Sequence, residues 1–176
     1  MKRLRWITLL SDDANSVRSE VEQRLGLSEC SYVAEFEGFG VSSALFPLGA
    51  DRFLEVCGPV TEDAPAARHL RRHGPCVYTA VIQVAEIESH RKRMEQQGIR
   101  VVLDMDRDYP RGRYQSIQLH PRDTGAALLS FDVSQPADDF VVVERPWRDH
   151  VRTGVVNDIV GIELTGPDEV TLGRRW

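Results

Sequence analysis

The chain has 176 residues, of which 41% are hydrophobic and 28% charged, a composition typical of a globular domain and not of a disordered segment. Its 22 lysine and arginine residues against 27 aspartate and glutamate residues give a formal net charge of −5, which is not the basic footprint of a nucleic-acid-binding domain. No apolar run approaches the ~20 residues that span a bilayer, and the short run over 6–10 is too brief for the core of a signal peptide.

The first part of the chain predicts one helix among four strands. A buried strand over 6–10 is followed by a polar turn that ends at Asp13, whose side chain can cap a helix. Apolar residues then recur at helical spacing from Val17 to Leu25, and Gly26 supplies a helix end. Three further strands, separated by glycines, are expected over 32–36, 41–46 and 53–57. The predicted order is therefore β-α-β-β-β.

The same order of elements repeats in the second part. An amphipathic helix is expected over 86–97, and Gly98 closes it. The strands of this part are expected over 77–84, 99–103, 114–119 and 127–133. The intervening segments 106–112 and 120–125 are predicted as loops, and 61–74 links the two parts and carries a short helical run.

A constant spacing relates the two parts and a third start near the end of the chain. Residues 159–164 are predicted as a strand, and a helical stretch begins at Asp168. Asp13, Glu86 and Asp168 each open a helix seven residues after the middle of the preceding strand, at Trp6, Thr79 and Gly161. The first two parts repeat after about 73–75 residues, a period longer than that of solenoid repeats. We interpret the pattern as duplicated βαβββ modules. Chance remains the alternative, because β-α alternation is common in mixed proteins.

These modules resemble the vicinal oxygen chelate superfamily, the group of glyoxalase I, bleomycin-resistance proteins and extradiol dioxygenases. The residues that carry the resemblance are Trp6-Ile7-Thr8-Leu9 with Asp13, Phe53-Leu54-Glu55-Val56 with Pro59, Gly74 to Thr79, Gly98, and His120-Pro121-Arg122-Asp123-Thr124-Gly125. The last of these, a loop before the final apolar strand, is most similar to the methylmalonyl-CoA-epimerase-like branch. The resemblance implies an α+β fold in which two βαβββ modules, 4–60 and 76–134, form one half-open, glyoxalase-like barrel around a cavity.

The resemblance also implies a divalent metal in that cavity, held by one ligand from each of four strands and acting as a Lewis acid. The usual ligands are two histidines and two carboxylates or a glutamine. The four positions fall on Trp6, Glu55, Thr79 and Ser130. Only Glu55 is a ligand of the right kind, since an indole cannot bind the ion and neutral hydroxyls bind it poorly. We therefore expect no metal and no other cofactor.

Two functions remain open on this reading, a non-catalytic small-molecule binder and a metal-independent lyase or isomerase. In the first, Trp6, Thr8, Thr79 and Ser130 would line an apolar and aromatic cavity. In the second, Glu55 or His120 would be the acid/base residue. Glu55 needs burial for that role, whereas an ion pair with an arginine such as Arg52 or Arg113 would make it structural. A purely structural interaction module is a third reading.

The loops supply further candidates for ligand binding. His120 ends an apolar strand and begins a turn, so it is either a loop anchor or a histidine at the cavity rim. Arg113, in the basic stretch 107–113, and Arg122 could bind a phosphate or carboxylate group of a CoA-type substrate. A solvated loop is the alternative reading of 107–113, because acidic residues lie beside the arginines.

For the domain organisation, we expect a glyoxalase-like domain over 1–135, a linker over 136–156 and the start of a further module over 157–176. Two modules complete one barrel, so a third start indicates either a longer two-barrel chain that is cut short here or docking onto a second subunit. The expected partners are a small molecule and a second copy in a homodimer, and neither nucleic acid nor a membrane. Cys30, Cys57 and Cys76 form no CxxC pair, which indicates reduced thiols and a cytoplasmic location.

Overall fold

The computed structural model describes residues 2–36, 39–49, 51–125, 128–143, 146–164 and 168–175. The chain divides into two units, each of which is described by itself. The first unit consists of Trp6–Tyr78 and Val143–Ile159. The second unit consists of Met1–Arg5, Thr79–Val142 and Val160–Trp176.

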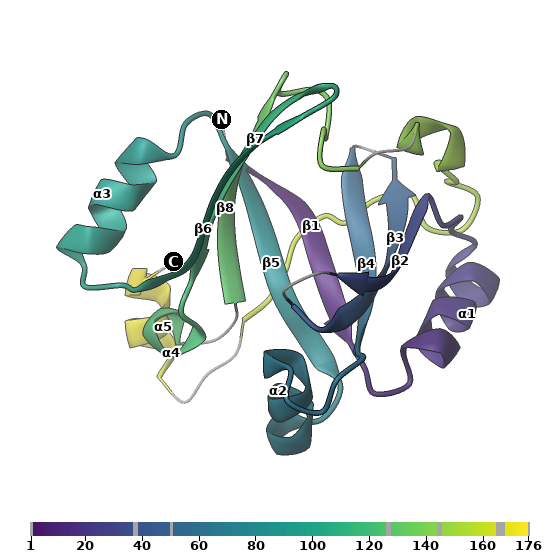
Figure 1. Cartoon of the computed structure of the whole chain (residues 1–176), viewed down its shortest axis with the longest axis horizontal. Coiled ribbons are helices and arrows are strands. Elements are labelled where there is room, and N and C mark those ends of the chain that lie inside the picture. The colour runs from purple at the N-terminus through teal and green to yellow at the C-terminus, as the bar shows by residue number, and fades with distance from the viewer. Residues whose placement is uncertain are drawn as a thin grey trace. The chain divides into compact units, whose positions relative to one another are not determined.

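The first unit contains the predicted β-α-β-β-β order (Figure 1). Its elements are β1 (Lys2–Leu10, counted here from Trp6), α1 (Ala14–Leu25), β2 (Ser31–Phe36), β3 (Val41–Leu48), β4 (Arg52–Pro59), α2 (Pro65–His73) and the 3-10 helix η1 (Trp147–His150). The strands lie in the order β2-β3-β4-β1, with β1 parallel to β4 and the other pairs antiparallel. Helix α1 packs Val21 against a core that contains Phe46, Leu54 and Val56.

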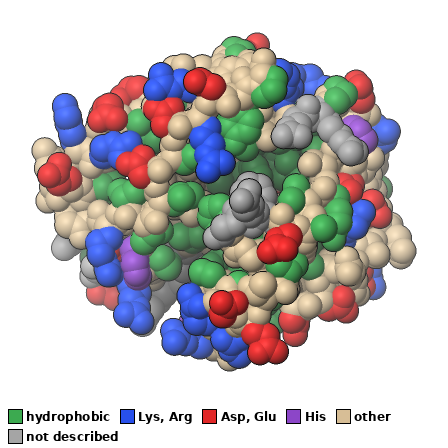
Figure 2. Space-filling model, viewed as in Figure 1, with side chains coloured by type: hydrophobic (Ala, Val, Ile, Leu, Met, Phe, Trp, Pro, Cys, Tyr) green, Lys and Arg blue, Asp and Glu red, His purple; other side chains and the backbone are tan. Residues whose placement is uncertain are grey.

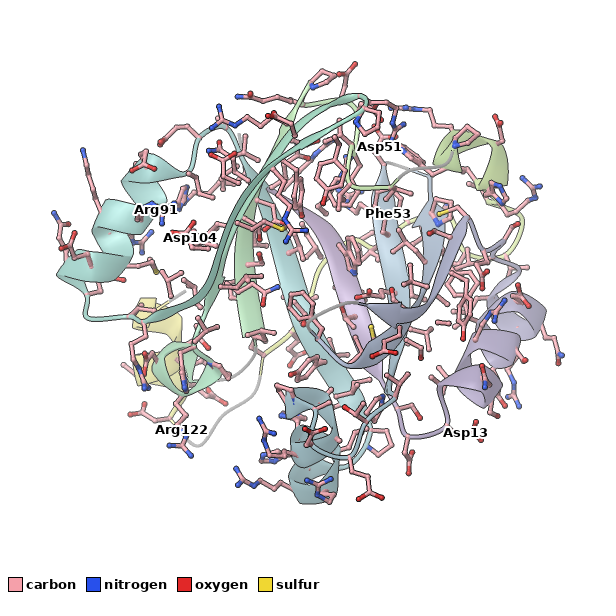
Figure 3. All side chains as sticks on the ribbon, in the orientation of Figure 1. Asp13, Asp51, Phe53, Arg91, Asp104 and Arg122 are labelled. Atoms are coloured by element: carbon pink, nitrogen blue, oxygen red, sulfur yellow. The ribbon has the colours of Figure 1, made fainter. Side chains whose placement is uncertain are left out.

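The local signals that predicted α1 act as expected. Asp13 Oδ1 accepts a hydrogen bond from the backbone N–H of Ser16 at 3.1 Å, which satisfies one of the donors left free at a helix N-terminus. Asp13 is seen at the start of α1 in Figure 3. Gly26 ends the helix in the left-handed region, at φ 65°, where a residue with a Cβ is strained.

The second unit repeats the order. Its elements are β5 (Cys76–Val84, counted here from Thr79), α3 (Glu88–Gln96), β6 (Val101–Tyr109), β7 (Gly112–Leu119), the short helix α4 (Pro121–Thr124), β8 (Leu128–Gln135) and α5 (Glu169–Arg175). The strands lie in the order β5-β8-β7-β6, with β5 parallel to β8. Met94 of α3 joins a buried core with Ile117, Leu129 and Phe131, so α3 covers one face of these strands (Figure 1).

Strand pairing shows that the two modules are built on the same register. Glu55 on β4 lies opposite Thr8 on β1 and Leu45 on β3. Ser130 on β8 lies in the matching place, opposite Val81 on β5 and Gln118 on β7. The equivalence of Glu55 and Ser130 that the period predicts is therefore found, and the α+β fold of two βαβββ modules is confirmed.

The segment 106–112, predicted as a loop, instead forms the end of one strand, the turn and the start of the next strand of a β-hairpin. Strand β6 continues to Tyr109, and β7 begins at Gly112. Arg113 Nε donates to Asp106 Oδ1 at 2.7 Å across the two strands, so oppositely charged side chains support this edge of the sheet. The prediction was wrong because charged residues on both faces of an exposed edge strand resemble a loop in sequence. The second predicted loop, 120–125, contains α4.

The strand predicted over 159–164 is not formed. These residues have no regular secondary structure, and the Val160 side chain is 98% exposed. In the first unit, the preceding residues are held by other contacts: Asn157 O accepts a hydrogen bond from Gly49 N at 3.0 Å, and Asp158 pairs with Arg52. A strand needs a neighbouring strand for its backbone groups, and the described residues supply none here.

Residues 136–156, which we expected to be a linker, carry several buried side chains. Phe140 and Val141 are buried in the second unit, and Val143 and Trp147 in the first. The boundary between the units falls after Val142. Acidic and basic side chains are interspersed over the visible face in Figure 2. Among the described residues, no helix combines the length and apolarity that a membrane crossing requires.

Candidate functional site

Glu55 lies at the centre of a hydrogen-bonded cluster in the first unit. Trp6 Nε1 donates to Glu55 Oε2 at 3.0 Å, and Thr8 Oγ1 donates to the same oxygen at 2.6 Å. Ser43 Oγ donates to Glu55 Oε1 at 2.5 Å. The alternation of side chains along β1, β3 and β4 places these residues on one face. The half-buried carboxylate is therefore held in one orientation by three neutral donors.

The ion pair weighed for Glu55 is not formed. Arg52 pairs with Asp158 of the irregular segment after η1. Arg113, which belongs to the second unit, pairs with Asp106 of β6. The reading of Glu55 as half of an ion pair with either arginine was wrong, because each arginine has an acidic partner in its own unit.

Cys57 lies two residues beyond Glu55 on the same face of β4, opposite Ser43. Burial, and next the negative charge of Glu55, raise the pKa of the Cys57 thiol far above its ordinary value. The protonated thiol is a poor nucleophile. Cys57 is accordingly a packing residue of this face.

A second carboxylate cluster, which the sequence did not reveal to us, lies in the second unit. Asp132 on β8 is 2% exposed and accepts hydrogen bonds from the hydroxyls of Tyr114, Ser116 and Ser130, with Ser116 Oγ at 2.9 Å. Burial raises the pKa of Asp132 from 3.8 to about 6, and these hydroxyl donors oppose the rise. Burial and the nearby Asp132 likewise raise the pKa of Tyr114. The cluster is a buried proton-binding group close to neutral pH.

The two clusters occupy nearly the same place in the two modules. Ser43 lies opposite Cys57 in the first module, and Ser116 lies opposite Asp132 in the second. The carboxylate of the second module is thus displaced by two residues along the last strand, from the position of Ser130 to that of Asp132. A signal for it exists in the sequence: Ser130, Asp132 and Ser134 alternate with apolar residues, which places three polar side chains on one buried face.

Of the four residues that the sequence predicts to line a cavity, two lie in each unit. Trp6 and Thr8 contact Glu55, as described above. Ser130 Oγ donates to Asp132 and lies 2.9 Å from Ser116 Oγ. Thr79 is buried on β5 opposite Leu128.

His120 is the N-cap of α4. Its Nδ1 accepts a hydrogen bond from the backbone N–H of Arg122 at 3.2 Å, so only Nε2 is left for a ligand. The half-buried ring therefore makes a contact of the kind that a loop anchor makes. The side chains of Arg113 and Arg122 are both exposed (Figure 3 labels Arg122 on α4), and Arg113 is engaged by Asp106.

Replacing His120 by alanine is expected to lower the free energy of unfolding by about 1 kcal/mol, because α4 loses its N-cap acceptor. Chemical denaturation measures the change. His120→Asn is the matched control, since asparagine can cap the helix and should keep most of the stability. A loss of ligand binding in both variants without a loss of stability would contradict the loop-anchor role.

A further contact that the sequence did not suggest joins α2 and β5. Cys76 Sγ lies 3.4 Å from His69 Nε2, although the two residues are separated in sequence. Burial raises the pKa of Cys76, and burial followed by the charge of His73 lowers that of His69. Both directions favour a neutral thiol beside a neutral imidazole. The pair is a hydrogen bond between uncharged groups and not a preformed thiolate–imidazolium pair.

One thiol per native chain is expected to react with 5,5′-dithiobis(2-nitrobenzoate), because Cys76 is partly exposed whereas Cys30 and Cys57 are buried. Absorbance of the released thiolate gives the count, which should rise to three after denaturation. Cys76→Ser should abolish the native reaction. A native reaction that persists in this variant would show that the buried thiols are accessible.

The residues at the four usual metal positions do not fit a divalent ion. The Trp6 indole has no lone pair to offer and directs its N–H at Glu55, and the Ser130 hydroxyl donates to Asp132. Thr79 offers a neutral hydroxyl, so Glu55 is the one strong ligand among the four. Within the part of the chain that the structure describes, no three histidine, cysteine, aspartate or glutamate side chains lie close enough together to hold a metal.

The fold is the glyoxalase-like α+β fold that was expected from the sequence. Several methylmalonyl-CoA epimerases are among the solved structures that resemble this chain. The enzyme from Mycobacterium tuberculosis is 20% identical with a TM-score of 0.63, over 74% of this chain and 86% of that one. A variant of the Streptomyces coelicolor methylmalonyl-CoA epimerase, in complex with 2-nitronate-propionyl-CoA, is 20% identical with a TM-score of 0.66, over 78% of this chain and 97% of that one.

A hypothetical protein from Bacillus halodurans is 22% identical with a TM-score of 0.63, over 75% of this chain and 94% of that one. No protein-family profile matches the sequence, and no curated protein matches it. At these identities the likeness establishes the fold, while the activity of the neighbours does not transfer by similarity alone.

Proposed function

We propose that this protein binds a small organic molecule as a member of the glyoxalase, bleomycin-resistance and dioxygenase superfamily, and that it does so without the metal usual in that group. The observation that supports this proposal is the Glu55 cluster. The one carboxylate left at a metal-ligand position is held by Trp6, Thr8 and Ser43. The hydrogen-bond donors hold the carboxylate in one orientation, in which it can bind a polar group of an organic ligand. A metal ion would need several further protein side chains as ligands.

The ligand class is best sought among molecules that carry an acyl or aromatic group. The structural neighbours include methylmalonyl-CoA epimerase in complex with methylmalonyl-CoA and with 2-nitronate-propionyl-CoA. The partly exposed Trp6 adds an aromatic surface beside Glu55. Acyl-CoA thioesters, catechols, glutathione adducts and aromatic antibiotics are therefore the first compounds to test.

A thermal-shift screen with these compounds, in buffer that contains a chelator, tests the proposal. A ligand at 100 times its Kd stabilises the folded state by about 2.7 kcal/mol, so a true ligand produces a clear rise in Tm. The result expected is stabilisation by at least one compound class that is unchanged when the chelator is replaced by Zn²⁺ or Mn²⁺. Stabilisation that appears only with an added metal would contradict the metal-free reading.

A metal-independent lyase or isomerase is the alternative, with Glu55 or His120 as the acid/base residue. The observation that favours it is the fixed orientation of the half-exposed Glu55 carboxylate, since a general base has to be held within hydrogen-bond reach of the proton it removes. Proton NMR in D₂O would detect exchange of the α-proton of an acyl thioester. Exchange in the presence of a chelator that Glu55→Gln abolishes would favour the enzyme, and its absence the binder.

We propose a cytoplasmic location, because all three cysteines are free thiols in the structure. We also propose that the partners are a small molecule and a second copy of the chain, and not nucleic acid or a membrane. The acidic net charge of −5 supports the exclusion of nucleic acid. Light scattering of the purified protein measures the assembly directly, and a monomeric mass would contradict the dimer.

A further inference from the structure

We propose that α3 is held to its strands by a pH-sensitive contact, and that protonation of His90 at mildly acidic pH loosens this helix. The contact belongs to the second unit, whereas Glu55 belongs to the first, so it is independent of the proposed small-molecule function. Three features carry the proposal: the place of the His90 ring in the core, the surroundings of its Nδ1 atom, and the charges near it.

The His90 side chain belongs to the apolar face of α3. Ile87, at the start of the helix, His90 and Met94 follow one another at helical spacing, and they are 3%, 9% and 3% exposed. Ile87 and Met94 join the core cluster of the second unit that also contains Phe131 of β8. The His90 ring lies 4.4 Å from the Phe131 ring, centre to centre, with the two planes inclined by 31°. A group that can gain a positive charge therefore lies within the apolar contact between α3 and β8.

The Nδ1 atom of His90 makes this position unfavourable for the charged ring. It is buried and has no hydrogen-bond partner within the part of the chain that the structure describes. A neutral imidazole can keep its proton on Nε2, whereas an imidazolium carries a proton on both nitrogens. Protonation in place would thus bury a charged N–H donor without an acceptor, which costs more than an unpaired neutral group. The charged ring becomes stable when Nδ1 reaches water, and for this the ring has to leave its place between α3 and β8.

The charged groups near the ring add to this effect on balance. Burial, and next the positive charge of Lys2 on β1, lower the pKa of His90 below its ordinary value of 6.5. Arg93 of α3 acts in the same direction, and Glu86 opposes both arginine and lysine. The Glu86 carboxylate accepts hydrogen bonds from Ser89, one of them from the backbone N–H at 3.1 Å, so it is engaged at the start of α3. The surroundings of His90 therefore favour the uncharged imidazole.

The charges on the neighbouring strands β8 and β6 are directed elsewhere. On β8, Asp132 follows Phe131 and points to the opposite face of the sheet, where it accepts a hydrogen bond from Tyr114. On β6, Asp104 pairs with Arg91 of α3, and Figure 3 labels both residues. Among the described residues, His90 is therefore the group that acid pH charges within the contact of α3 with β8.

Acidification weakens the hold on α3. The folded chain binds the His90 proton less tightly than an open or unfolded chain, in which the pKa is near 6.5. The stabilising contribution is complete above about pH 6.5 and is lost as the pH falls below this value. Opening of α3 alone hydrates the ring, so local opening becomes easier without unfolding of the whole chain. The sign is opposite to that of Asp132, whose pKa is raised, so the two effects can be told apart.

Amide hydrogen exchange of the full chain at two pH values tests the proposal. The protection factors of the α3 amides, corrected for the intrinsic pH dependence of exchange, should fall about fivefold between pH 7.5 and pH 5.5. Helix α1 is the internal reference, because it contains no histidine. Its protection factors should change by less than about twofold over the same range.

Two variants assign the effect to His90. His90→Phe keeps a ring against Phe131 but cannot take up a proton, so its α3 protection should be the same at both pH values. His73→Gln removes an exposed imidazole from α2 and should keep the loss of protection seen in the wild type.

A second measurement decides the matter if His90→Phe fails to fold. The imidazole C–H resonances of His90 in the wild-type chain, followed by NMR, should titrate with a midpoint below 6.5. Protection of α3 that does not change with pH, an equal loss of protection in His90→Phe, or a midpoint at or above 6.5 would each overturn the inference.

Discussion

Replacement of Trp147 by alanine is expected to lower the free energy of unfolding by about 3–5 kcal/mol. Trp147 is 1% exposed, and its ring centre lies 5.0 Å from that of the fully buried Phe53 in an edge-to-face arrangement. The alanine side chain leaves most of that volume empty and removes the aromatic contact. Urea denaturation followed by circular dichroism measures the change. The result would show that the segment 143–159 is part of the first unit's core.

Two controls separate this role from a general effect of the segment. Trp147→Phe keeps a ring against Phe53 and should cost clearly less than alanine. Val155→Ala changes a side chain that is 68% exposed in the same segment and should stay within about 0.5 kcal/mol of the wild type. A Trp147→Ala variant as stable as Val155→Ala would mean that the segment behaves as the linker the sequence suggested.

Asp132 is expected to make the stability of the chain fall as the pH rises from about 4 to about 6. Burial raises the pKa of Asp132 to about 6 in the folded state, so the folded chain binds this proton more tightly than the unfolded chain. A raised pKa contributes stability below the unfolded-state value near 3.8, and this contribution is lost as the pH passes the folded-state value. The change amounts to about 3 kcal/mol at most.

Comparison with Asp132→Asn isolates this contribution from that of other carboxylates. The wild-type free energy of unfolding minus that of Asp132→Asn should decrease between pH 4 and pH 6.5, because asparagine does not titrate. Asp108→Asn, which changes an exposed residue of β6, should show no such trend. If the difference between wild type and Asp132→Asn is constant over this range, Asp132 does not bind its proton more tightly in the folded state.

The order of the elements could be predicted because local signals and periodicity agree. Asp13 and Gly26 mark both ends of α1, and the apolar runs of β1, β4 and β8 are bounded by turn residues. The hairpin around Pro110 could not be predicted from those signals. Its strands lie at a sheet edge, where Asp106 and Arg113 are stabilised by each other and not by burial.

The site could be predicted only where a residue is unusual for its own strand. Glu55 is an acidic residue in an apolar strand, and the register of β1 and β4 brings Trp6 and Thr8 to it. Asp132 does not follow from strict equivalence of the two modules, because the position equivalent to Glu55 is Ser130. The second carboxylate lies two residues further along β8. The alternation of Ser130, Asp132 and Ser134 predicts a polar face there, whereas the approach of Tyr114 and Ser116 to Asp132 depends on the pairing of β7 with β8.

The Cys76–His69 contact could not be predicted from spacing at all. It depends on how α2 packs beside the start of β5, where the rings of His69 and Tyr78 also lie 5.0 Å apart. Helix packing of this kind is decided by tertiary contacts and not by the residues within either element.

Calorimetric titration of the chelator-treated protein with Zn²⁺, Ni²⁺, Co²⁺ and Mn²⁺ tests the central claim most directly, namely that Glu55 is held by Trp6, Thr8 and Ser43 for an organic ligand and not for a metal. The account predicts no stoichiometric binding that depends on Glu55, so the titration curves of wild type and Glu55→Gln should coincide. Binding of one ion per chain that disappears in Glu55→Gln would contradict it.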